Sequence, residues 1–310
     1  MTLAPQRPLT IGLSPYHLAG PSPAAVVSLL IADRVVTIVP TPPGEPDRAR
    51  ARRKAESIPR FVELVDRWRW SVPLWLDGVL RGDLDGDDPA RGVHDVVRDI
   101  ADRDDLTPLR PFLHRGRDAD DRLWLDAIAS DLLRGGPDPG LAVPVTAALD
   151  AFCARTGALA ARCEPNSIAE RAEVKLARRR ARVAFPAFLG CTAERLLEAR
   201  DLLEPQLRAL RVAITTGAAE PACRAAADAL AEAFESHADH LTRVVDDLDP
   251  RTRTAWVSVE LSELPADAAL RSSVHAAMAP EVGRLRRAPT AVLAPPAGSL
   301  DAAFIRVVGR

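Results

Sequence analysis

The sequence predicts a helix-dominant protein of the α/β class, with α+β as the alternative. The first observation behind this prediction is the stretch 9–40, which reads as an apolar run, a polar turn, an apolar segment of helical length and a β-branched run. The second is that further strand-like runs alternate with amphipathic segments along the rest of the chain. Together they indicate a partly parallel sheet of about six or seven strands.

The first unit is a strand at 9–13, a helix after Ser22 and a second strand at 34–40. Ser22 is a suitable N-cap, and Pro23 follows at the first helical position, where its missing N–H costs nothing. A strand, a helix and a strand within about thirty residues favour a parallel βαβ unit. Periodicity alone leaves an antiparallel return open.

Residues 46–140 change character and read as mainly helical, with an acidic loop at 82–92 and a linker-like stretch at 135–140. We therefore expect three parts with soft boundaries. Residues 1–45 form the first βαβ unit of an α/β body, residues 46–140 a helical insertion or cap, and residues 141–310 the remainder of the body. A single domain is the alternative.

The remainder begins with a helix at 143–156 and a strand at 157–163. A capping box at Ser167 and Glu170 opens a basic helix, a strand follows at 183–190, and Thr192 caps a helix that Pro205 divides. A long helix is expected at 220–248. Three more strands are expected at 254–263, 290–296 and 302–310, with a helix at 267–279 after the first of them.

Composition narrows the classes of partner. The 41 basic and 43 acidic residues balance and aromatic residues make up 4%, so we expect no nucleic-acid partner. The apolar runs are too short to span a bilayer and no secretory signal is visible, which predicts a cytoplasmic protein without a membrane partner. The four cysteines are far apart and are expected to be free thiols. Whether the chain forms a homo-oligomer stays open.

The turn after the first strand contains the first candidate catalytic residues. Tyr16 is the only tyrosine in the chain, and His17 can exchange protons near neutral pH. Ligands bind beyond the carboxyl ends of parallel strands, where this turn would lie. We expect His17 to act as general acid or base and Tyr16 to donate a hydrogen bond to the substrate. The structural alternative is a packed aromatic and a histidine bonded to backbone.

Glu164 and Asn166 follow the strand at 157–163 and precede the basic helix. The amino end of a helix presents free N–H groups and positive potential, which suits a carboxylate or phosphate ligand. We therefore expect Glu164 and Asn166 to bind substrate, with Arg178 and Arg179 contributing to an anionic-ligand pocket. Alternatively, Glu164 stabilises the helix start.

Cys191 lies between a predicted strand and a predicted helix start, where the helix dipole can lower the pKa of a thiol. We list it as a third catalytic candidate, with core packing as the alternative. His237 and His240 are spaced to ligate one metal, but no complete metal signature surrounds them. The acidic stretch 83–88 begins like a calcium loop and then departs from it. No metal is predicted, and because no dinucleotide or P-loop motif is present, no cofactor is predicted either.

These observations favour an enzyme acting on a small anionic substrate, a carboxylate or a phosphate, by acid/base chemistry at strand-end loops. The reaction class stays open between lyase, hydrolase and transferase. The alternative is a non-catalytic helical scaffold or adaptor that binds a protein partner through the region of Trp68, Trp70 and Trp75.

Overall fold

The computed structural model describes residues 7–40, 47–104, 107, 110, 121–134, 139–163, 178–189, 191–216, 220–243, 253–264 and 302–308. In the strands at 178–189, 253–264 and 302–308 the description covers the backbone. The predicted strand at 290–296, the helix at 267–279 and the capping box of Ser167 and Glu170 lie outside these residues.

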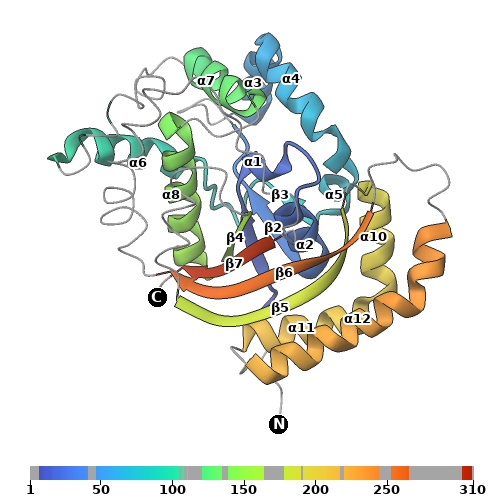
Figure 1. The fold of residues 1–310 in the computed structure, drawn as a ribbon. Helices are drawn as coiled ribbons and strands as arrows, with labels where there is room; N and C mark the ends of the chain where they lie inside the picture. The colour runs from blue at the N-terminus through green and yellow to red at the C-terminus, as the bar shows by residue number, and fades with distance from the viewer. Residues whose placement is uncertain are drawn as a thin grey trace, which may run out of the picture.

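The strands form one sheet with the order β3-β2-β1-β4-β7-β6-β5 (Figure 1). They are β1 (Thr10–Leu13), β2 (Arg34–Thr37), β3 (Leu80–Arg81), β4 (Leu159–Cys163), β5 (Arg178–Leu189), β6 (Arg253–Leu264) and β7 (Ala302–Val308). The four strands from β3 to β4 run parallel to one another. β7 pairs antiparallel with β4 and parallel with β6, and β5 pairs antiparallel with β6. The α/β class is therefore confirmed, with a parallel part of four strands.

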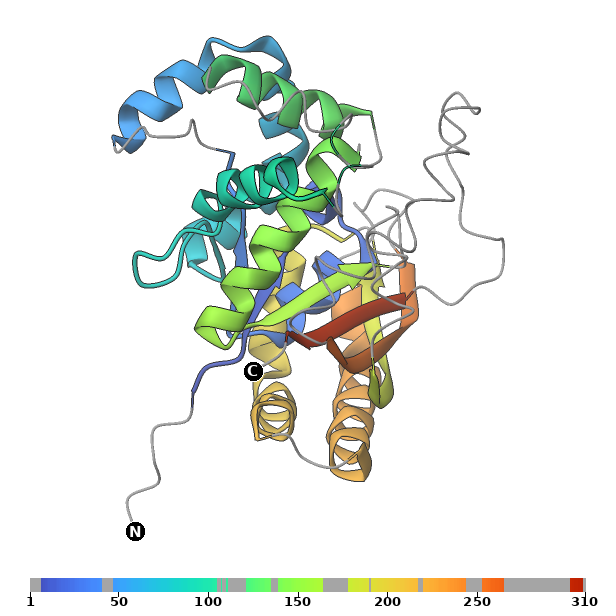
Figure 2. The same cartoon turned by 90° about the vertical axis from the view of Figure 1, so that its left-hand side faces the viewer.

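Helices account for most of the remaining described chain. They are α1 (Pro15–Leu18), α2 (Pro23–Ile31), α3 (Arg48–Glu56), α4 (Pro59–Trp68), α5 (Val72–Asp77), α6 (Arg91–Asp102), α7 (Asp121–Leu133), α8 (Pro139–Thr156), α10 (Ala193–Leu202), α11 (Glu204–Thr215) and α12 (Glu220–Arg243). Helices α3, α4 and α7 gather on the side of the molecule away from α11 and α12 (Figure 2). None of the described helices is long and apolar enough to cross a membrane.

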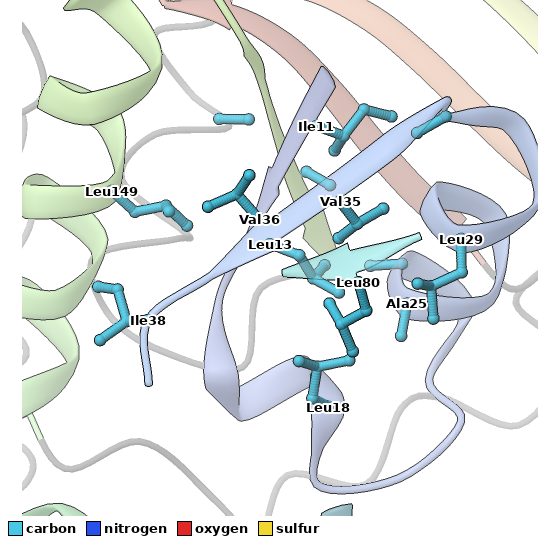
Figure 3. Close-up of a cluster of buried hydrophobic side chains, with 14 of the residues drawn as sticks. Ile11, Leu13, Leu18, Ala25, Leu29, Val35, Val36, Ile38, Leu80 and Leu149 are labelled. Atoms are coloured by element: carbon cyan, nitrogen blue, oxygen red, sulfur yellow. The ribbon is translucent and has the colours of Figure 1, made fainter. Parts of the chain in front are cut away.

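The parallel strands are covered on both faces, by α2 on one and by α8 on the other. Gly12 faces α8, because a Cβ atom at this position would lie 2.5 Å from Sγ of Cys153 and 3.3 Å from Leu149. Side chains alternate along a strand, so Ile11 and Leu13 face α2. Figure 3 shows this core, with Leu149 beside Val36 and Ile38 on one face and the α2 side chains on the other.

Helix α2 shows why the first unit folds as the sequence predicts. The Ser22 hydroxyl accepts the N–H of Ala25 and Pro23 is the first helical residue, so the predicted cap is confirmed. The last carbonyls of α2 are satisfied from a distance. Arg200 of α10 donates to Leu29, Leu30 and Ala32, and Arg211 of α11 donates to Ile31.

The structure departs from the sequence prediction in the segment 46–140 and at the start of β5. The segment 46–140 supplies the strand β3, which pairs parallel with β2, so a purely helical insertion or cap is not confirmed. β5 begins at Arg178, not at 183, so the end of the expected basic helix is strand. Pairing with β6 along its whole length gives this arginine-rich segment its backbone partners, and that pairing overrides local helix propensity. Pro205, as predicted, separates α10 from α11.

Candidate functional site

The candidate site lies where the strand order changes direction. From β1 the chain passes through α1 and α2 to β2 on one side, whereas β4 pairs with β1 on the other side, with Leu13 opposite Ala161. The connections that leave the carboxyl ends of β1 and β4 therefore start side by side. In open α/β sheets, ligands bind in the crevice outside such a switch point.

Helix α1 follows β1 at this edge and places Tyr16 and His17. The Ser14 hydroxyl accepts the N–H of Tyr16, and the Ser14 carbonyl accepts the N–H of His17. The Ser22 hydroxyl donates to the His17 carbonyl, which ties α1 to the start of α2. His17 is only 2% exposed, so this short turn is a fixed part of the core and not a loose surface loop.

Tyr16 contacts an acid that lies far away in the sequence. Its hydroxyl donates to Oδ2 of Asp131 at 2.8 Å, and Asp131 belongs to α7 and is fully buried. We did not predict Asp131 from the sequence. One signal was present, because Asp131 lies three residues after Ile128 and seven after Trp124, on the apolar side of its helix. A carboxylate in that position needs a buried partner.

A buried ion pair joins β4 to α8. Arg162 is the residue before the last of β4 and faces α8, and its Nη2 donates to Oδ1 of Asp150. Its Nη1 donates to the carbonyl of Ala161 at 3.0 Å. Both charged side chains are buried. We did not predict this pair either, and it fixes β4 against α8 near the carboxyl end of the strand.

Of the four predicted substrate-binding residues, the structure describes Arg178 and Arg179. Glu164 and Asn166 lie outside the described residues, although β4 ends just before them. Through β6 and β7, Arg178 is level with Leu159 at the start of β4. β5 is four strands from β1, roughly 19 Å across the sheet at a spacing of about 4.8 Å. This separation argues against a pocket shared by Tyr16 with Arg178 and Arg179, which are left out of the proposal below.

Cys191 lies immediately before α10, where Thr192 caps the helix as predicted, with its hydroxyl accepting the N–H of Arg195. Burial raises the pKa of the Cys191 thiol to about 12. The cost of burying a thiolate therefore opposes the expected activation by the helix start.

The acidic loop at 82–92 forms a tight turn that is bonded to α8. Asp85 and Gly86 have positive φ angles of 52° and 84°, and Leu84 and Asp87 bond to each other across the turn. Asp87 accepts two hydrogen bonds of 2.8 Å from Arg155, and these hold the pKa of its carboxyl below its ordinary value. No cluster of metal-binding side chains occurs within the described part of the chain, which leaves out the side chain of His240.

The tryptophan side chains of α4 and α5, and Trp70 between these helices, pack against the core. Trp68 is buried and stacks on Trp75 with ring centroids 6.4 Å apart, and Trp70 Nε1 donates to the carbonyl of Leu18 at the end of α1. The exposed large apolar side chains of this region are aliphatic instead, namely Val62, Val65, Val72 and Leu76. Of these, Leu76 is 84% exposed.

No protein-family model, curated protein or solved structure matches this chain.

Proposed function

We propose that the protein is an enzyme that acts on an anionic small molecule, a carboxylate or a phosphate, beyond the carboxyl ends of β1 and β4. The observation that carries this proposal is the change of direction in the strand order between these two strands. The residues that follow these strands include Tyr16 and His17 after β1 and Glu164 and Asn166 after β4, and loops held by a rigid sheet often carry binding and catalytic residues.

In this proposal His17 transfers a proton or orients the reacting group, and Tyr16 holds a polar group of the substrate. Glu164 and Asn166, which follow β4 directly in sequence, contribute to substrate binding. Backbone bonds fix α1 on both sides of His17, so the imidazole is pre-organised. Because His17 is buried, the substrate has to reach it in an enclosed site, where electrostatic interactions are stronger than in water.

The test is a thermal-unfolding screen of the full chain with small carboxylates and phosphates. We compare the wild type with His17→Asn and with a matched control, His237→Asn, which removes an imidazole from α12. A ligand of the site raises the Tm of the wild type and of the control, because it binds only the folded state. The same ligand gives no shift in His17→Asn relative to that variant's own baseline. Equal shifts in all three proteins, or none in the wild type, would reject the proposal.

A second candidate function is a non-catalytic adaptor. One observation favours it, since the outward sides of α4 and α5 carry exposed aliphatic residues, with Leu76 the most exposed. The expected version with exposed tryptophans is not supported, because Trp68 is buried. If the protein is an adaptor, it binds one defined partner. We expect Leu76→Asp to abolish this binding and His17→Asn to leave it unchanged. Quantitative affinity capture of wild type and both variants distinguishes this from the enzyme proposal.

A further inference from the structure

The hydrogen bond between Tyr16 and Asp131 limits what Tyr16 can do for a substrate. A phenol has a single hydroxyl proton. In the bond of 2.8 Å between Tyr16 and Oδ2 of Asp131, the hydroxyl of Tyr16 is the donor, so this proton points at Asp131. While this bond is present, Tyr16 has no proton to donate to another group.

We propose that Asp131 is a positioning residue that holds the hydroxyl proton of Tyr16, so that Tyr16 acts toward the substrate as a hydrogen-bond acceptor and selects a hydroxyl or amino group. This rests on the function proposed above and narrows its substrate class to anions that also carry a hydrogen-bond donor. It also replaces the expectation from sequence that Tyr16 donates to the substrate.

The position of Asp131 is itself fixed. Arg67 of α4 donates to the carbonyls of Leu132 and Leu133 at 3.0 and 3.1 Å, immediately after Asp131. About two turns before Asp131, Trp124 is buried and contacts the ring of His94 at a centroid distance of 4.7 Å. Helix α7 is thus held on both sides of Asp131, which is what a positioning residue requires.

Because Tyr16 is the only tyrosine, its hydroxyl can be observed directly in the full chain without a ligand. Tyrosine labelled with ¹³C at Cζ gives one NMR signal, and in an equal mixture of H₂O and D₂O this signal splits when the hydroxyl proton exchanges slowly. We expect splitting in the wild type and in the control Asp126→Asn, an exposed acid of the same helix. We expect a single averaged signal in Asp131→Ala and partial rescue in Asp131→Asn, whose amide oxygen can accept.

An averaged signal in the wild type, or an unchanged doublet in Asp131→Ala, would overturn the inference whatever the substrate is. If Asp131→Ala does not fold, Asp131→Asn decides, because a charged acceptor is replaced by a neutral one. A shifted Cζ resonance then supports the bond, and an unshifted one overturns it.

Selection of the donor group is tested with matched ligands, lactate against propionate and glycerol 3-phosphate against propyl phosphate. We expect the wild type to bind the hydroxylated member about tenfold more tightly, the effect of one lost hydrogen bond. Tyr16→Phe should bind both members equally. If the wild type binds both members of a pair equally, the selection of a donor group by Tyr16 is overturned, but the proposed function is not. If it binds neither pair, both the proposed function and this selection are rejected. The NMR result still tests the Tyr16–Asp131 bond in either case.

Discussion

The buried pair of Arg162 and Asp150 gives the sharpest test of how the sheet is held to α8. The side chains are 1% and 3% exposed, and Arg162 also bonds to the carbonyl of Ala161. Replacing Arg162 with Met removes the cation and leaves the Asp150 carboxylate buried without it. Removing one partner of a buried ion pair costs about 3–5 kcal/mol. A typical domain has a free energy of unfolding of only about 5–15 kcal/mol, so a loss of this size is readily measured by urea unfolding.

The double variant Arg162→Met with Asp150→Leu separates the pair from its surroundings. It removes both charges at once, and replacement of a buried pair by apolar residues is often close to neutral. We therefore expect the double variant to be more stable than Arg162→Met alone, by about 2 kcal/mol or more. The measurement is urea unfolding followed by circular dichroism, with all four proteins of the double-mutant cycle.

An exposed pair provides the matched control for this cycle. Arg155 and Asp87 also form a bidentate pair, but their side chains are 56% and 36% exposed. Their coupling should be only about 0.2–1 kcal/mol, because water screens the charges. The reasoning is refuted if Arg162→Met costs less than about 1 kcal/mol. It is also refuted if the two substitutions at the buried pair are additive to within about 0.5 kcal/mol.

The other predictions concern the close contact in the sheet, the buried thiols and the end of α2. Gly12→Ala should cost about 1–3 kcal/mol in urea unfolding, because its Cβ would meet Sγ of Cys153, and adding Cys153→Ala should recover most of this. Burial raises the pKa of the Cys153 and Cys191 thiols from 9.0 to about 12. The unfolded chain therefore releases these protons first, and the stability present below pH 9 should fall as pH rises toward 12. The decline should be shallower in the double variant Cys153→Ala/Cys191→Ala, and an equal slope would contradict it. Arg200→Met should cost about 2–3 kcal/mol, because its guanidinium bonds to three carbonyls of α2, whereas exposed Arg208→Met should change stability by less than about 0.5 kcal/mol.

Local chemistry in the sequence determined the first βαβ unit. The apolar run of β1, the Ser22 cap with Pro23, and the β-branched run of β2 each depend on residues within a few positions of one another. For the same reason the Thr192 cap and the division at Pro205 were predictable. The α/β class follows from the alternation of such elements, and so does the location of Tyr16 and His17 at the end of β1.

Tertiary structure alone decided which distant segments meet. β3 has two residues, too few to show any periodicity, and it is a strand because Leu80 pairs with Val35. The start of β5 is a strand because β6 supplies hydrogen bonds to it. Asp131 reaches Tyr16 across 115 positions, and only the packing of α7 brings them together. A sequence shows that a buried acid needs a partner, but the choice of partner depends on how the chain closes in space.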